Sequence, residues 1–277
     1  MYWVLKIFAL MILGAFVWFS IPYSPMKSEF SLKKYPFAKE QPTGQFFTME
    51  DIAGLPVPLQ NYFVNCGYIG KPKMSNMKIQ HHDVDFILNS KALKIKCTQY
   101  NSGEVPDRIA LIDTSLYGIP FEGLDTYQNG AGSMKGMIAK SVVLFNQTGE
   151  AMNQSSLVNC LAESLMIPSI ALKDFIQWET VDENQVKGTI SYYDLSVSGI
   201  FTFDIDGYLT SFTTNDRLFV DTDGTVNNIQ WSAICGDYRE IDGVMQPRTL
   251  KAIWHMPEGD LVYFDGHDTV IEYNVTE

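Results

Sequence analysis

The sequence lacks every short motif that would identify a familiar catalytic chemistry. Its 277 residues contain no GxSxG, HExxH or P-loop pattern. Two Ser-x-x-Lys matches, beginning at Ser24 and Ser31, stand without the companion motifs of the penicillin-interacting enzymes. The acidic segments 204–207 (DIDG) and 221–224 (DTDG) begin like a calcium loop but lack its third acidic ligand and its glutamate at position twelve. The sequence therefore indicates no nucleophilic, nucleotide-binding or EF-hand chemistry.

Cysteine is sparse and widely spaced. The chain has four cysteines and no CxxC pair, which excludes a zinc knuckle and a thioredoxin-like redox motif. We expect buried free thiols that pack as small apolar side chains, although disulfide pairing in an oxidising compartment stays open. The four residues are Cys66, Cys97, Cys160 and Cys235.

Positive charge is also scarce. The chain has 20 Lys and Arg against 32 Asp and Glu, a formal net charge of −12, and no basic cluster denser than Lys33-Lys34. This charge balance disfavours a nucleic-acid partner. Apolar residues make up 46% of the chain and aromatic residues 13%, a composition that excludes intrinsic disorder and predicts a folded domain.

One long uncharged run lies near the N-terminus, over residues 7–23. A helix of this length reaches across a hydrocarbon core of about 30 Å, and Lys6 can extend to the head groups. Because no small-residue cleavage site follows, residues 1–25 are predicted to be an uncleaved transmembrane signal-anchor rather than a removed signal peptide. The usual layout of such anchors favours a single-pass membrane protein with its globular domain outside the cytoplasm.

The rest of the chain divides into a tether and one domain. Residues 26–47 are polar, contain two of the prolines and show no helix or strand period, so they are predicted to form a tether. Residues 48–277 show no internal linker and are predicted to be one β-rich globular domain. Two short helices are expected to meet at Leu55-Pro56, and a longer one to run from Glu150 to Pro168.

Alternating apolar and polar residues dominate the domain and predict strands. Four Asp-Gly pairs, at 206–207, 223–224, 242–243 and 265–266, supply the positive φ angles that tight hairpins need. The predicted fold class is mainly β (α+β): a large curved antiparallel sheet or half-barrel with one main packed helix, preceded by the transmembrane helix.

Several segments resemble a known family in the same order. They are LPVPLQNYFVNCGYIGKP (55–72), GLDTYQNGAGSMKGMI (123–138), NCLAESLMIPSIAL (159–172) followed by Trp178, and Arg217 with Gly236-Asp237-Tyr238 and Trp254. This pattern resembles an uncharacterised prokaryotic family of membrane-anchored proteins that contain a domain of unknown function, which implies no activity. The expected architecture is similar to half-barrel lipoprotein carriers, whose lipidated cysteine this chain lacks.

Candidate ligand-binding residues follow from burial and charge. Glu163 lies on an apolar helix face and needs a partner, for which Arg217 is the first choice, either as a functional pair or as a structural ion pair. Asp125 and Tyr127 precede Gly130 and Gly132, which form either a ligand-approaching turn or an ordinary strand connection. The motif residues Trp178 and Trp254 complete the set.

A metal site is not expected. On a strand, His81 and Asp83 would share one face while His82 points away, which leaves too few ligands for a metal ion. No cofactor is expected either.

Three functions stay open. The first is a non-catalytic binding module for a lipid-like or other apolar ligand near the membrane. The second is an envelope hydrolase in which Glu163 and Asp125 act as an acid/base pair. The third is a structural or assembly factor, for which the sequence offers no positive mark.

Overall fold

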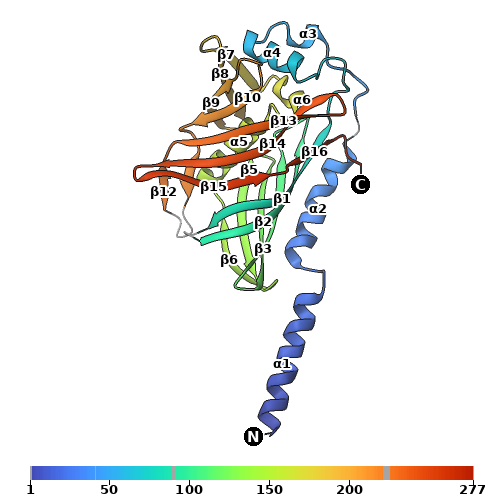
Figure 1. Cartoon of the computed structure of the whole chain (residues 1–277), viewed down its shortest axis with the longest axis vertical. Coiled ribbons are helices and arrows are strands. Elements are labelled where there is room, and N and C mark those ends of the chain that lie inside the picture. Colours follow the sequence, from blue (N-terminus) through green and yellow to red (C-terminus); the bar gives the residue numbers. More distant parts are fainter. Residues whose placement is uncertain (1, 41, 89–90, 221–224, 277) are drawn as a thin grey trace.

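The computed structural model describes residues 2–40, 42–88, 91–220 and 225–276. A long N-terminal helix, α1 (Tyr2–Ser20), projects from a β-rich body (Figure 1). Helices α2 (Pro25–Lys39), α3 (Met49–Ile52) and α4 (Val57–Asn65) lead into that body. A capping box between Thr48 and Asp51 begins α3, and α4 begins after Pro56, so the two predicted short helices are confirmed.

The body is one large antiparallel sheet. Its order is β6-β5-β4-β3-β2-β1-β15-β14-β13-β10-β9-β8-β7, with β16 paired to β1. The strands are β1 (Asn76–Leu88), β2 (Lys91–Ser102), β3 (Arg108–Leu116), β4 (Ile119–Gln128), β5 (Ala131–Ile138), β6 (Val142–Gln147), β7 (Ile176–Thr180), β8 (Gln185–Tyr192), β9 (Leu195–Phe203), β10 (Leu209–Thr214), β13 (Trp231–Ile241), β14 (Val244–Met256), β15 (Gly259–His267) and β16 (Val270–Tyr273). A separate ribbon consists of β11 (Leu218–Val220) and β12 (Val226–Asn228). The predicted mainly β fold is confirmed.

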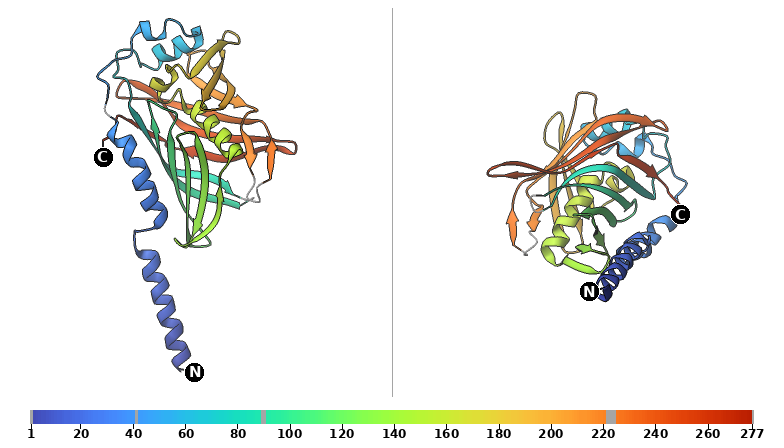
Figure 2. Two further views of the ribbon diagram at one scale, coloured as in Figure 1. Left: turned by 180° about the vertical axis from the view of Figure 1, so that it is seen from behind. Right: turned by 60° about the horizontal axis from the view of Figure 1, so that its bottom comes forward.

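The sheet curves strongly around helix α5 (Glu150–Glu163) (Figure 2). Register shifts interrupt the pairing of β1 with β2, β5 with β6, β9 with β10 and β14 with β15, and such bulges bend and twist a sheet. The helix approaches β5 closely at Gly132, whose amide donates to Asn153 Oδ1 at 2.8 Å. A Cβ at Gly132 would lie 2.4 Å from the Met152 carbonyl oxygen. Glycine is therefore what allows α5 to lie this close to the sheet.

The helix predicted from Glu150 to Pro168 ends earlier, at Glu163, and Pro168 instead begins α6 (Pro168–Ala171). Proline is favoured in the first turn of a helix because its missing amide has no partner to lose there. Helices α3, α4, α5 and α6 pack against the sheet to form the main core. All four cysteines are free and buried, which confirms the expectation of packed thiols.

The structure differs from the predicted tether over residues 25–39, which form α2. Met26, Phe30 and Phe37 lie on one helical face and pack against Tyr100 and other residues of β2 to β5 in a second apolar cluster. The helix begins at the N-cap Ser24, whose hydroxyl accepts from the Lys27 amide at 3.0 Å. The spacing of four and seven residues between these apolar side chains is helical, but polar residues and two prolines, Pro25 and Pro36, obscured it.

The Asp-Gly predictions have mixed outcomes. Asp242-Gly243 connects β13 to β14 with φ angles of 52° and 74°, as a type I′ hairpin requires. Asp206-Gly207 lies in the turn between β9 and β10. Asp223-Gly224 lies outside the described residues. The turn predicted at Asp265-Gly266 is wrong, because both residues lie within β15 and pair with Lys251 and Leu250 of β14.

Candidate functional site

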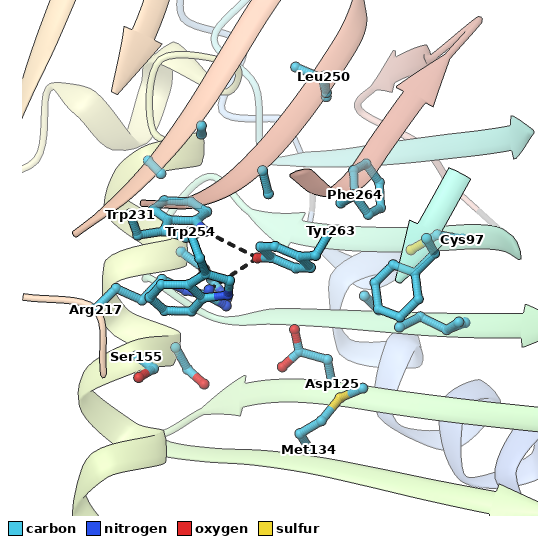
Figure 3. A pocket seen from close by; sticks show the side chains of 18 of the residues that line it. Cys97, Asp125, Met134, Ser155, Arg217, Trp231, Leu250, Trp254, Tyr263 and Phe264 are labelled. Carbon is cyan, nitrogen blue, oxygen red and sulfur yellow. Dashed lines mark hydrogen bonds between the residues drawn. The ribbon is translucent and has the colours of Figure 1, made fainter. Parts of the chain in front are cut away.

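A cavity of about 570 Å³ lies between the concave face of the sheet, α5 and β11 (Figure 3). Its volume is within the range of about 300–1,000 Å³ typical of small-molecule sites. Apolar lining residues include Phe86, Phe145, Met152, Met166, Phe219, Trp231, Trp254, Leu261, Tyr263 and Phe264. Polar lining residues include Gln99, Arg108, Asp125, Asn159, Glu163, Arg217 and Lys251. The wall is thus mainly apolar and aromatic, with few charged groups.

Arg108 of β3 is the centre of a buried ion-pair network. Its Nη1 donates to Asp125 Oδ2 at 2.6 Å, and its Nε and Nη2 donate to the two oxygens of Glu163 at 3.2 and 3.3 Å. Gln99 accepts from Nη2 at 3.0 Å and donates to Glu163 at 2.8 Å, and Asn101 also donates to Glu163. Burial would lower the pKa of Arg108, but the two carboxylates outweigh it and raise that pKa. The guanidinium therefore stays charged.

A second arginine, Arg217, lies against aromatic rings. Its guanidinium carbon is 4.6 Å from the ring centroid of Trp231 and 4.9 Å from that of Trp254, within cation–π range. Arg217 Nε donates to Asn159 Oδ1 at 3.0 Å and Nη1 donates to Tyr263 Oη at 3.0 Å. Trp231 Nε1 donates to the same hydroxyl at 3.1 Å (Figure 3). Three aromatic side chains thus fix the guanidinium at the cavity wall.

The predicted pairing of Glu163 with Arg217 is wrong, since Glu163 pairs with Arg108 and Arg217 contacts Asn159 and Tyr263. The two predicted residues do line the same cavity. Arg108 escaped sequence reasoning because it begins an ordinary alternating strand. Its one signal was a lone basic residue at the start of an apolar strand, RIALI.

The other predicted residues divide between the cavity and the core. Asp125 and Trp254 line the cavity. Tyr127 is fully buried in the main core, and its hydroxyl has no hydrogen-bond partner among the described residues. Trp178 donates to the Ala171 carbonyl at 2.8 Å and packs against Phe201. Neither Tyr127 nor Trp178 is among the described residues that line the cavity.

The glycine-rich segment after Tyr127 is an ordinary connection. Asn129 and Gly130, with φ angles of 53° and 79°, form the tight turn from β4 to β5. Gly132 approaches helix α5 and not a ligand space. The second of the two predicted interpretations is therefore correct here.

The histidine pair is separated by a bulge. The register of β1 shifts between His81 and Val84, so that His81 is buried while His82 and Asp83 are exposed. The expectation that His81 and Asp83 share a face is wrong for this reason. His81 Nδ1 lies 3.0 Å from Thr269 Oγ1, and burial lowers the pKa of His81 to about 4. Its imidazole is therefore neutral at pH 7 and belongs to the cavity wall.

The arrangement is chemically suited to holding an apolar molecule. Burial raises the pKa of Cys97, the thiol that lines the cavity, to about 12, which removes the thiolate that nucleophilic catalysis needs. Asp125 and Glu163, the carboxylates of the predicted acid/base pair, both bind Arg108.

Comparison with protein families identifies the chain. The model of a family of unknown function, DUF6544, matches residues 45–266, and the chain belongs to that family. The resemblance predicted from the sequence motifs is confirmed. A search of curated proteins found no match.

Two solved structures are similar to this chain. A LolA superfamily protein from Nitrosomonas europaea has 11% sequence identity and a TM-score of 0.41, with 79% of this chain and 94% of that chain covered. A DUF1329 family protein from Desulfovibrio piger has 13% identity and a TM-score of 0.42, with 92% of this chain and 95% of that chain covered.

Proposed function

We propose that this protein is a membrane-anchored binding module whose cavity holds a lipid-like apolar ligand. The single observation that carries the proposal is the cavity of about 570 Å³ with a mainly apolar and aromatic wall. Each methylene group of a ligand moved from water into such a space is worth about 0.8 kcal/mol. An acyl chain of ordinary length therefore gains enough free energy to bind.

Cavity-filling substitutions test this proposal. Ala233 of β13 and Ala252 of β14 are a cross-strand pair and both line the cavity. Ala233→Phe and Ala252→Phe place a ring in the ligand space, whereas Ser196→Phe places one on the exposed part of β9. The full chain is extracted into lipid nanodiscs and its co-purifying lipids are measured by native mass spectrometry.

We expect a lipid-like adduct on the wild type and on Ser196→Phe, and its loss from both alanine variants. Adducts that persist unchanged in Ala233→Phe and Ala252→Phe would place the ligand elsewhere and remove the proposal. Thermal unfolding of each variant provides the control for folding.

The membrane anchor is α1. The helix is long and apolar enough to cross a bilayer, and its described side chains are almost all exposed. Its last turn contacts the turn between β5 and β6: Trp18 Nε1 donates to the Ala139 carbonyl at 3.1 Å, and Lys140 Nζ donates to the carbonyls of Trp18 and Phe19. A cation at a helix C-terminus is stabilising. These contacts support a body held close to the membrane.

The proposed orientation has the body outside the cytoplasm. The four native cysteines are buried and cannot report it, so a reporter is introduced as Ser196→Cys on the exposed surface. We expect a membrane-impermeant maleimide to label this variant on intact cells and to leave the wild type unlabelled. Labelling that requires lysis would place the body in the cytoplasm.

A further inference from the structure

The cavity contains three cationic side chains, and they differ in their partners. Arg108 binds Asp125 and Glu163, and Lys251 Nζ lies 2.9 Å from Asp265 Oδ2. Arg217 pairs with no carboxylate among the described residues. Among the described residues, its printed contacts are the neutral side chains of Asn159, Trp231, Trp254 and Tyr263.

The guanidinium of Arg217 also has unused donors. Of its five N–H groups, one on Nε and one on Nη1 bond to Asn159 and Tyr263. No described residue accepts from Nη2. A partly buried guanidinium with free, parallel N–H groups satisfies its hydrogen-bonding capacity only when an acceptor binds to those groups.

The position of Arg217 is fixed by helix α5. The Gln154 side chain donates to the Asp216 carbonyl at 2.7 Å, and the Ser155 hydroxyl donates to the Leu218 carbonyl at 2.9 Å. Together with Asn159, these residues hold the segment around Arg217 from both sides. The guanidinium is therefore preorganised and loses little freedom when it binds a ligand.

We propose that Arg217 binds the anionic head group of the ligand, so that the cavity takes amphiphiles with a carboxylate or phosphate at one end. This inference rests on the proposed function and names its ligand class. Trp231 and Trp254 flank the guanidinium and also line the apolar space. An acyl chain that starts at the Arg217 fork therefore continues along these indoles into the cavity, which a free inorganic anion would leave empty.

Paired photoreactive probes test the head group. The full chain in phosphatidylcholine nanodiscs is irradiated with a diazirine-bearing 16-carbon carboxylic acid or with the matching alcohol. Adducts on cavity-lining peptides between residues 231 and 267 are then measured by mass spectrometry. We expect the acid to label these peptides at least about 10-fold more than the alcohol, the discrimination given by a charge-assisted hydrogen bond.

The variants separate charge from packing. Arg217→Gln is expected to reduce labelling by the acid to the level of the alcohol and to leave labelling by the alcohol unchanged. Arg217→Lys keeps the charge without the planar fork and is expected to keep part of the preference. Arg248→Gln, the matched control, removes an arginine that is not among the described residues lining the cavity and that already pairs with Asp237, and it is expected to keep the full preference.

The remaining outcomes overturn specific claims. Equal labelling by acid and alcohol in the wild type, or a preference that survives in Arg217→Gln, removes the anionic head-group site and leaves the apolar cavity intact. Labelling that inorganic phosphate suppresses as strongly as hexadecyl phosphate assigns Arg217 to a small free anion and also overturns the inference. Absence of cavity labelling by both probes removes the proposed function itself.

Discussion

Single residues decide how each charge in the cavity wall is neutralised. Arg108 makes its hydrogen bonds within the protein, because two carboxylates and Gln99 accept from its N–H groups. Arg217 instead stacks on indoles and is the one cation of the described cavity wall without a carboxylate partner. The first arginine therefore belongs to the structure of the wall, and the second is the proposed contact with the ligand.

Replacing Arg108 tests its structural role. Arg108→Met leaves Asp125 and Glu163 as unpaired charges in a largely buried site, and we expect the free energy of unfolding to fall by about 3–5 kcal/mol. Lys94→Met is the control: Lys94 pairs with Asp83 and Asp85 at an exposed site, and its loss is expected to leave the free energy of unfolding nearly unchanged. Urea unfolding measures both, and equal losses would contradict a structural network.

His81 predicts how stability depends on pH. Its pKa is lowered to about 4 in the folded state by burial, against about 6.5 in an unfolded chain. Below pH 6.5 the unfolded state binds a proton that the folded state does not, so stability falls as the pH decreases from 6.5 towards 4, by up to about 3 kcal/mol.

The variant His81→Asn removes this titration and retains an amide that can reach Thr269. We expect its free energy of unfolding to change less between pH 7 and pH 4.5 than that of the wild type. Urea unfolding at the two pH values checks this, and parallel losses in both proteins would assign the acid sensitivity to other groups.

At the scale of elements, the contact between α5 and β5 shapes the cavity. Residues of α5 line one side of the ligand space and also hold the Arg217 segment. The helix is able to take this place because Gly132 presents no side chain to its backbone.

Gly132→Ala is expected to force α5 away from β5 and to reduce the free energy of unfolding by about 1–3 kcal/mol, the usual cost of overpacking. Gly54→Ala is the matched control, since no atom lies within 4 Å of the added methyl group, and its effect should stay within about 0.5 kcal/mol. Thermal and urea unfolding measure the difference, and an unchanged Gly132→Ala protein would contradict the close approach.

At the scale of the whole molecule, α1 projects from the body, whereas α2 packs against it. The described side chains of α1 are almost all exposed, whereas α2 buries Met26, Phe30 and Phe37 against the outer face of the sheet. Because α2 buries these side chains, we treat it as part of the folded body of this chain, although the family match begins only at residue 45, after both helices.

Two truncations test this division. Deletion of residues 1–22 is expected to give a soluble protein that keeps its unfolding midpoint within a few degrees. Deletion of residues 1–44 also removes α2, whose buried side chains are worth about 1.5–3 kcal/mol each, and is expected to lower the midpoint strongly and to cause aggregation. Equal midpoints, measured by scanning calorimetry, would return residues 26–47 to the role of a tether.

Local interactions allowed several features to be predicted from the sequence. The apolar run over 7–23, the cap at Thr48 and the turn at Asp242-Gly243 depend on residues within a few positions of each other. For this reason α1, α3 and the hairpin between β13 and β14 could be predicted. The turn predicted at Asp265-Gly266 was wrong because two neighbouring strands, β1 and β14, extend their pairing through it.

The candidate site needed tertiary structure. The sequence by itself singled out Glu163, because a carboxylate on a predicted apolar helix face needs a partner, and Arg217, as a residue of the family motifs and the first candidate for that partner. Only the fold decided their partners. Glu163 pairs with Arg108, which lies 55 residues earlier in the sequence, and Arg217 donates to Tyr263, which lies 46 residues later. Strand order and bulges set these distances, and both depend on pairing between segments far apart in the chain, which no local pattern encodes.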